Sequence, residues 1–248
     1  MSFAGRGIVV TRPRELAQPL AAAIERRGGR AIVFPAIEIE ELPAPAALQR
    51  IPDYDLVIFV SPTAVHVAMR ALGTWPASVA AAAIGTGTRR ELERAGVAGV
   101  IAPQAGADSE ALLAAPPLRD MAGKRVLIVR GQGGRPVLGN ALVSRGATVE
   151  YAQCYRRLRP ASDATPLVEH WQRGEVDAVT VSSAEGFDNL LALTGAEGAA
   201  LFARTPLFVP HPRIASHARL RMSAEVVVAG PGDDELVERL VAYFDGRT

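Results

Sequence analysis

The chain has 248 residues, of which 49% are hydrophobic and 21% charged, and its net charge at pH 7 is +1. This composition is typical of a globular protein, and the length allows one large domain or two ordinary ones. The small net charge argues against an electrostatic nucleic-acid binder, and no apolar run reaches the ~18 residues of a membrane span.

Short, continuous apolar runs alternate with amphipathic stretches along the whole chain. In chain order the predicted strands are Ile8–Val10, Ala31–Phe34, Leu56–Val60, Ala80–Ile84, Val126–Val129, Ala178–Val181, Leu207–Val209 and Val226–Ala229. The predicted helices include Glu15–Arg27, Ala64–Leu72, Arg89–Ala95, Ser109–Ala115, Pro136–Arg145, Ala184–Leu193 and Asp234–Phe244. Continuous rather than alternating apolar runs are typical of strands buried on both faces. The pattern therefore predicts an α/β protein with open parallel sheets covered by helices on both faces.

The chain also repeats itself. GRGIVVTRP resembles GKRVLIVRG, DLVIFVSPTAV resembles DAVTVSSAEGF, and later blocks match in the same order. The paired positions are Arg27 with Arg145, Ser61 with Ser183, Gly85 with Pro210, and Asp108 with Asp233, and their separations are 118, 122, 125 and 125 residues. The alternative is that all strand–helix units look alike. A slow drift of the separation is what loop insertions in a duplicated unit leave behind, so we expect two similar α/β domains of about 120 residues each.

Small, polar and basic residues follow the predicted strands. Ligands of open parallel sheets bind beyond the carboxyl ends of the strands, where the first N–H groups of the next helix favour anions. Facing domains would form a wide cleft for a polyanion. The candidate ligand-binding residues are Thr11, Arg12, Ser61, Gly85, Thr86, Thr88, Arg130, Gly131, Ser182, Ser183, His211 and Arg213. For Ser61, Thr88 and Ser183 the alternative role is helix capping, and for His211 it is the geometry of a turn between two prolines.

The residue inventory argues against several chemistries. Lys124 is the only lysine, which leaves little room for a Schiff base, and 26 basic residues are arginines, through codon bias or because guanidinium groups suit carboxylates. The four histidines and Cys154 show no metal-binding spacing, so we expect no metal and no cofactor. The glycine cluster at 131–135 is only a weak phosphate-loop signal, because it lacks the lysine and the spacing.

Several sequence blocks recur in the order of a known family. They are VVTRP (9–13), PAIEIE (35–40), DLVIFVSPTAV (55–65), AIGTGT (83–88), ADSEALL (107–113), VLIVRGQGGR (126–135), RGATVEYAQCYRR (145–157), VDAVTVSSAEGFDNL (176–190) and HPRIASHAR (211–219). No single block is specific, but together and in this order they resemble the uroporphyrinogen-III synthase family over essentially the whole chain.

The resemblance implies an interleaved domain arrangement rather than two contiguous halves. Residues 1–36 and 158–248 would form one domain and residues 43–150 the other. Residues 37–42 and 151–157 would be linker strands paired in a two-stranded ladder. Prolines at 35, 43, 45 and 160 flank these segments, as expected of extended backbone.

The resemblance also implies a reaction. The family cyclises hydroxymethylbilane, a linear tetrapyrrole with eight carboxylates, to uroporphyrinogen III with inversion of ring D and loss of water. Tyr155 matches the family's tyrosine in the second linker and would assist departure of the hydroxyl; the alternative for Tyr155 is packing in the ladder. Other readings are a non-catalytic two-domain binding protein and a regulator with a synthase-like domain.

The resemblance and composition imply a cellular setting as well. We expect a cytoplasmic monomer, because the chain runs directly into a strand without a signal-peptide pattern and its one cysteine cannot form an internal disulfide. Its expected partners are the substrate and, transiently, the preceding hydroxymethylbilane synthase, with no nucleic acid and no membrane.

Overall fold

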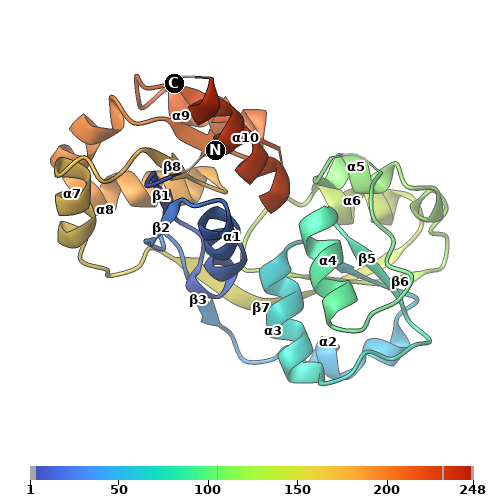
Figure 1. The fold of residues 1–248 in the computed structure, drawn as a ribbon. Helices are drawn as coiled ribbons and strands as arrows, with labels where there is room; N and C mark the ends of the chain where they lie inside the picture. The colour runs from blue at the N-terminus through green and yellow to red at the C-terminus, as the bar shows by residue number, and fades with distance from the viewer. Residues whose placement is uncertain (1–3, 105, 231, 247–248) are drawn as a thin grey trace. The chain divides into compact units, whose positions relative to one another are not determined.

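The computed structural model describes residues 4–104, 106–230 and 232–246. The chain divides into two compact units. Unit 1 combines residues up to 38 with those from 158 onward, and unit 2 comprises residues 39–157 (Figure 1). Each unit is an α/β structure around its own mainly parallel sheet.

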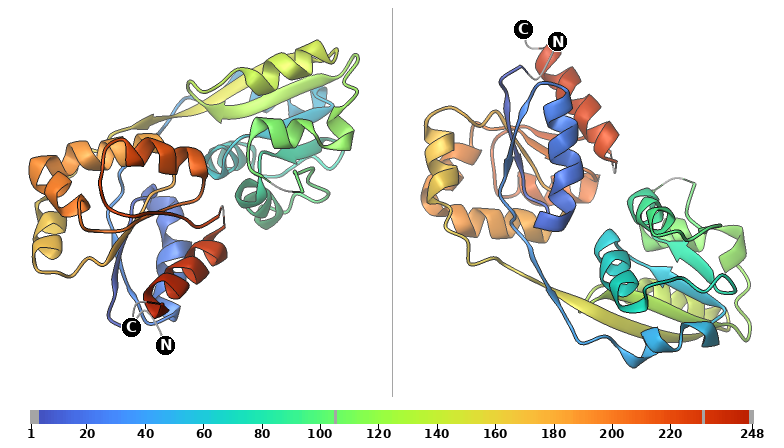
Figure 2. Two further views of the ribbon diagram at one scale, coloured as in Figure 1. Left: turned by 90° about the horizontal axis from the view of Figure 1, so that it is seen from above. Right: turned by 60° about the horizontal axis from the view of Figure 1, so that its bottom comes forward.

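Unit 1 has three layers. Its sheet runs in the order β10-β9-β8-β1-β2, built from β1 (Gly7–Val10), β2 (Arg30–Val33), β8 (Ala178–Thr180), β9 (Leu207–Val209) and β10 (Val226–Val228). Helices α1 (Arg14–Arg26) and α10 (Asp233–Asp245) pack together on one face, which Figure 2 shows. Helices α7 (Thr165–Gln172), α8 (Ala184–Phe202) and α9 (Pro212–Arg219) cover the other face. Side chains of β1 alternate between the two cores, with Ile8 and Val10 on one side and Val9 on the other.

Unit 2 repeats this plan. Its sheet runs in the order β3-β7-β6-β4-β5, built from β3 (Glu38–Glu41), β4 (Leu56–Phe59), β5 (Ala80–Ala83), β6 (Arg125–Gly131) and β7 (Thr148–Leu158). One face carries α2 (Ala46–Gln49), a 3-10 turn (Ile51–Asp53), α3 (Pro62–Leu72) and α4 (Thr86–Arg94). The other carries α5 (Ser109–Leu113), a 3-10 turn (Pro116–Leu118) and α6 (Val137–Ser144).

The two sheets share one topology, which supports the duplication. Under the repeat, β1, β2, β8 and β9 correspond to β6, β7, β4 and β5, and these occupy the same order in the two sheets. Even the edge strand β10 has a counterpart in unit 2, reduced to a single parallel bridge between Ala82 and Ile101. Ala82 lies 125 positions before Leu207 and Ile101 lies 125 positions before Val226, and these two residues pair in unit 1. Generic similarity among strand–helix units would not reproduce the strand order.

The predicted α/β class and its parallel sheets are confirmed, and every predicted strand forms. The clearest differences are at helix ends. Helix α8 continues to Phe202 although the prediction ended it at Leu193, because the chain passes through Gly195 at φ 62° and then resumes helical geometry. Helix α4 begins at Thr86, three residues earlier than predicted. The predicted second linker segment lies within β7, which pairs with β6 from Thr148 onward and lies beside β3.

The same pair of contacts joins strands at the amino ends of both sheets and explains the position of the only lysine. Asp177 accepts hydrogen bonds from Arg6 Nη1 at 2.7 Å and from the backbone N–H of Gly7 at 2.8 Å. Asp55 accepts hydrogen bonds from Lys124 Nζ at 3.1 Å and from the backbone N–H of Arg125 at 2.8 Å. Lys124 lies 118 positions after Arg6, so it is the duplicate of an arginine in a structural contact.

Candidate functional site

The predicted ligand residues lie at the carboxyl edges of the two sheets. In each unit the parallel register brings the ends of neighbouring strands to one edge. The edge of unit 2 holds Ser61, Gly85, Thr86, Thr88, Arg130, Gly131 and Tyr155. The edge of unit 1 holds Thr11, Arg12, Ser182, Ser183, His211 and Arg213.

The side chain of Tyr155 crosses one strand of unit 2. Tyr155 lies near the end of β7, and its phenol oxygen lies 2.9 Å from Oγ of Ser61, just after the end of β4. The strand between them is β6, whose last residue is Gly131. A Cβ on Gly131 would stand 2.7 Å from the ring carbons Cε2 and Cζ of Tyr155 and 3.1 Å from its oxygen. Glycine at this position therefore makes room for the phenol to cross the sheet edge.

A register shift in the β6–β7 ladder helps to set up this crossing. Arg130 is opposite Gln153, but Gly131 is opposite Tyr155, so Cys154 is the extra residue. The N–H of Gln132 donates to the carbonyl of Tyr155 at 2.7 Å and holds the backbone after the shift. Irregularities of this kind at strand ends re-aim the following side chain.

The surroundings keep Tyr155 and Cys154 protonated. Burial raises the pKa of the Tyr155 phenol above its ordinary value of 10.0, and the hydrogen bond with Ser61 opposes this shift. Only 4% of Tyr155 is exposed, so it meets solvent over a small area. Burial also raises the pKa of the Cys154 thiol to about 11, which makes Cys154 a poor nucleophile.

Arg130 is held beside this site by the glycine cluster. Its guanidinium lies over the ring of Tyr151, 5.3 Å from the centroid, and its Nε donates to the carbonyl of Gly131 at 3.3 Å. Gly134 has φ 93°, and a Cβ there would come within 2.2 Å of Arg130 Nη2. The glycines that gave a weak phosphate-loop signal thus make room for two side chains, the phenol and the guanidinium.

The third strand end of unit 2 differs from the prediction in one respect. Thr88 does not cap α4. The N-cap is Gly85, whose Cβ would stand 2.6 Å from that of Ala107, and Thr88 lies inside the first turn with 2% exposure. The capping alternative for Thr88 was wrong because the predicted helix started three residues late. Thr86 is exposed at the start of the helix, whereas Thr88 offers little surface to a ligand.

In unit 1 the strand-end side chains already have partners. The hydroxyl of buried Thr11 donates to the carbonyl of Thr180 at 2.8 Å, and the hydroxyl of Thr180 donates to the carbonyl of Val9 at 2.9 Å. These bonds join β1 to β8. Arg12 Nη1 lies 2.6 Å from a carboxylate oxygen of Asp233, at the start of α10. A ligand carboxylate at Arg12 would therefore compete with Asp233.

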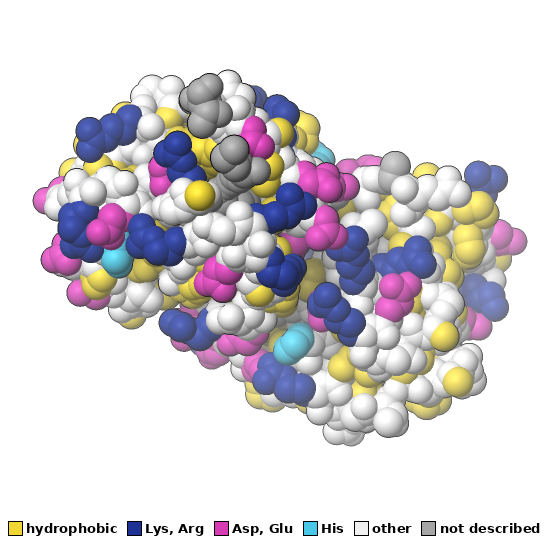
Figure 3. All heavy atoms as spheres, viewed as in Figure 1, with side chains coloured by type: hydrophobic (Ala, Val, Ile, Leu, Met, Phe, Trp, Pro, Cys, Tyr) yellow, Lys and Arg dark blue, Asp and Glu magenta, His cyan; other side chains and the backbone are white. Residues whose placement is uncertain are grey.

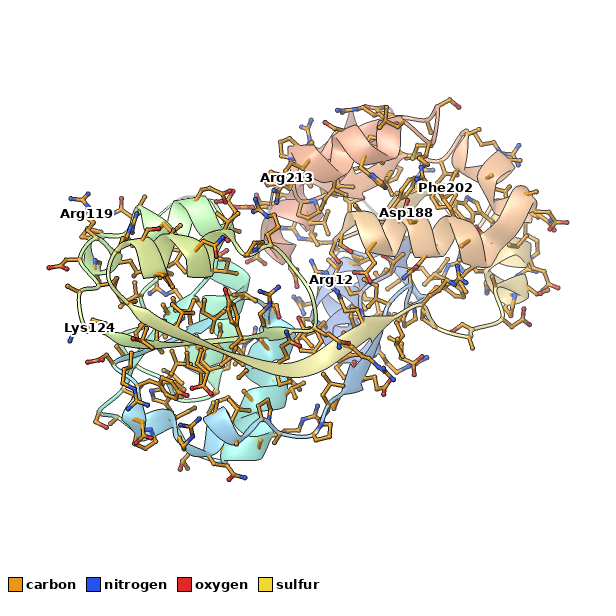
Figure 4. All side chains as sticks on the ribbon, turned by 180° about the vertical axis from the view of Figure 1, so that it is seen from behind. Arg12, Arg119, Lys124, Asp188, Phe202 and Arg213 are labelled. Atoms are coloured by element: carbon orange, nitrogen blue, oxygen red, sulfur yellow. The ribbon has the colours of Figure 1, made fainter. Side chains whose placement is uncertain are left out.

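The remaining residues of unit 1 begin helices. Ser183 caps α8 by accepting from the N–H of Gly186 at 3.0 Å, as Ser61 caps α3 by accepting from Ala64. His211 caps α9, because its Nδ1 accepts from the N–H of Arg213 at 3.1 Å. An accepting Nδ1 carries no proton, so the neutral ring carries it on Nε2. Ser182 and Arg213 are exposed, and Figure 4 labels Arg213 and Arg12 on unit 1.

Two features of the site were missed from the sequence. The first is the ion pair between Asp233 and Arg12; the repeat had matched Asp233 with Asp108 but did not indicate this pairing. The residue 118 positions before Tyr155 is Ile37, a buried side chain whose Cδ1 would be 3.5 Å from a Cβ on Gly186 in α8. The same register that aligns Arg27 with Arg145 therefore shows that only one copy of the site has a phenol.

Charge is mixed over the visible face of the molecule. In Figure 3 arginine and lysine side chains are interspersed with acidic ones over both units. Among the residues that the structure describes, no group of three histidine, cysteine, aspartate or glutamate side chains could hold a metal ion, and no helix is long and apolar enough to cross a membrane.

The fold and site define a class: an α/β protein of two duplicated, interleaved units with polar strand ends. Solved structures share this fold. The uroporphyrinogen III synthase mutant from Thermus thermophilus matches with a TM-score of 0.60 at 22% identity over 98% of this chain and 100% of its own. The uroporphyrinogen-III synthetase from Helicobacter pylori matches with a TM-score of 0.58 at 14% identity over 96% of this chain and 99% of its own.

Sequence comparison gives the family. The model for uroporphyrinogen-III synthase HemD matches residues 18–238. The uroporphyrinogen-III synthase of Escherichia coli is 36% identical over 75% of this chain and 79% of its own, and that of Proteus mirabilis is 30% identical over 75% and 97%. The chain therefore belongs to the uroporphyrinogen-III synthase family, enzymes of the lyase class in haem biosynthesis. The alternative of a non-catalytic binding protein has no support.

Proposed function

We propose that the chain cyclises hydroxymethylbilane to uroporphyrinogen III, with inversion of ring D and loss of water. Family membership over residues 18–238 is the observation that carries the reaction. The substrate supplies its own electrons, because its pyrroles are nucleophilic. The protein's task is to hold a flexible chain in one geometry and to assist the leaving hydroxyl.

Tyr155 is the residue we assign to the leaving group. The hydroxyl of the bilane departs as the first ring becomes an azafulvene, and the hydroxide together with the proton lost from that pyrrole nitrogen makes water. The last ring, ring D, then attacks the azafulvene through its substituted α-carbon and forms a spiro intermediate. Fragmentation and recombination of this intermediate invert ring D. A phenol that stays neutral can donate a hydrogen bond to the departing oxygen, and the raised pKa of Tyr155 supports this role.

The substrate's carboxylates are proposed to bind at the strand ends of both units. Thr86, Ser182 and Arg213 are the most exposed side chains among the candidates. The N-termini of α3, α4, α8 and α9 add backbone N–H groups, which favour anions. Arg12 would join this set by exchanging Asp233 for a substrate carboxylate. Thr11 and Thr88 are buried, so we assign them to the shape of the edges.

The cellular setting is also a proposal. We propose a cytoplasmic monomer that receives its unstable substrate from hydroxymethylbilane synthase. Spontaneous closure without inversion gives the competing isomer, so a short transit between the two enzymes would favour the correct product.

The test is a coupled assay in which hydroxymethylbilane is generated in place and the uroporphyrin isomers are resolved after oxidation. We expect isomer III to form faster than isomer I forms without the protein. Isomer I alone, at the spontaneous rate, would refute the proposed activity. Tyr155→Phe should slow formation of isomer III at least several-fold without changing thermal unfolding. An unchanged rate would show that Tyr155 has no part in the reaction.

A further inference from the structure

A chain of hydrogen bonds ends on the phenol of Tyr155. The backbone N–H of Ala64, in the first turn of α3, donates to Ser61 Oγ at 3.0 Å. Ser61 Oγ in turn lies 2.9 Å from the phenol oxygen of Tyr155. Two different elements, the start of α3 and the end of β7, therefore meet at one serine hydroxyl.

The hydrogen bonds can run toward the phenol. A serine hydroxyl has one proton to donate and two lone pairs to accept with, and the Ala64 N–H occupies one lone pair. The geometry of the 2.9 Å contact between Ser61 and Tyr155 allows either hydroxyl to donate. When Ser61 donates to the phenol oxygen, the phenol's own proton points away from Ser61. Bonds in such a chain polarise one another in the same direction, which strengthens the last donor.

The meeting point has a defined place in the sheet. Strands β4 and β6 are neighbours, but the helices that follow them lie on opposite faces, α3 on one and α6 on the other. Ligands of open α/β sheets bind where the connections diverge in this way. Ser61 follows β4 as the N-cap of α3, and Gly131 ends β6, so the phenol is held at the position where this fold binds ligands.

We infer that Ser61 is a positioning residue for Tyr155: it orients the phenol by donating to its oxygen, and it leaves the phenol proton directed at the substrate. The inference rests on the proposed role of Tyr155 and assigns Ser61 to that residue rather than to a substrate carboxylate. The competing explanation is that Ser61 only caps α3.

The duplication supplies a matched comparison. Ser183 caps α8 with the same geometry, accepting from the N–H three residues on at 3.0 Å. The position that corresponds to Tyr155 is Ile37 in that unit, which has no hydroxyl. Ser61→Ala therefore removes a cap and the bond to Tyr155, whereas Ser183→Ala removes a cap and no bond to a phenol.

The experiment is a pair of double-mutant cycles with Tyr155→Phe, scored by kcat and KM for isomer III and by thermal unfolding. Ser61→Ala should lower kcat by about threefold to tenfold, the worth of one hydrogen bond, with little change in KM. In the Tyr155→Phe background it should lower kcat no further. Ser183→Ala should have the same effect on turnover in both backgrounds, because residues that share no partner act additively.

Two further variants separate positioning from capping. Ser61→Gly keeps an acceptable helix start without the hydroxyl and should lose kcat like Ser61→Ala, which also covers the case in which alanine destabilises the fold. Ser61→Thr keeps the hydroxyl and should retain a kcat close to that of the wild-type enzyme. Additive effects of Ser61→Ala and Tyr155→Phe would overturn the inference alone. A Tyr155→Phe enzyme with wild-type turnover would overturn the proposed role of Tyr155 and the inference with it.

Discussion

The crossing of Tyr155 over Gly131 can be tested by adding one methyl group. In Gly131→Ala the new Cβ would stand 2.7 Å from two ring carbons, whereas an ordinary contact begins near 3.4 Å. The ring must therefore retreat by about 0.7 Å. A shift directed entirely along the bond to Ser61 would lengthen the 2.9 Å contact to at most about 3.6 Å, beyond hydrogen-bonding distance. Displacing a reacting group by about an ångström can cost up to ~100-fold in rate, so we expect kcat to fall about tenfold to a hundredfold.

Folding should be spared, because Gly131 does not have a positive φ and alanine can adopt its backbone. Gly133→Ala is the control. It adds left-handed strain at φ 80° but meets nothing within 4 Å, so it should cost about 1–2 kcal/mol of stability and leave kcat unchanged. The assay resolves the uroporphyrin isomers with time, alongside thermal melts. A folded Gly131→Ala enzyme with wild-type kcat would refute the reasoning, since the phenol would then need no passage across β6.

Three other predictions concern charge and reactivity. Asp233→Asn should lower KM by up to about fivefold, because it frees Arg12 from a partly exposed ion pair; a higher KM would mean that Asp233 holds Arg12 in place for the substrate. The Cys154 thiol, with its pKa raised to about 11, should resist alkylation at pH 8 in the native protein and react at once in urea, and rapid native labelling would contradict its burial. The backbone N–H of Arg125 and then Lys124 lower the pKa of Asp55, so its stabilising contribution is present above the unfolded pKa and disappears as the pH falls. Asp55→Asn should thus lower the melting temperature at pH 7 but not at pH 2, and an equal loss at both would refute this.

The architecture could be predicted from the sequence because local hydrophobic patterns determine which segments form strands and helices. Each buried strand is a short apolar run, such as Leu56–Phe59 or Leu207–Val209, and each lies within one or two residues of its predicted place. The repeat was also visible, since loop insertions shift the separation without erasing the blocks. The carboxyl edges followed from the parallel register, so the sequence predicted which residues would line them.

The contacts within each edge could not be predicted, because they depend on side chains that cross between strands. Nothing in the sequence near Arg12 indicates that its guanidinium pairs with Asp233, more than 200 residues later. The contact between Tyr155 and Ser61 could not be predicted either. The two residues are 94 positions apart in sequence, and one strand of the sheet lies between the strands that carry them. Capping was the alternative role for Thr88 because a threonine before a polar helix is a common N-cap, whereas the N-cap is the glycine three residues earlier.

The comparison of the two copies explains why the phenol belongs to one unit. At the register of 118 residues, Tyr155 corresponds to Ile37 and Gly131 corresponds to Pro13. The serine caps are the same in both copies, at Ser61 and Ser183. A tyrosine placed at 37 would have a proline at the position that Gly131 holds in unit 2, and would lack the space that the glycine provides. Two differences, a hydroxyl gained and a side chain removed, are therefore needed together, and unit 2 alone has both. Duplication of the fold thus left two polar strand-end edges but only one phenol for the proposed leaving-group role.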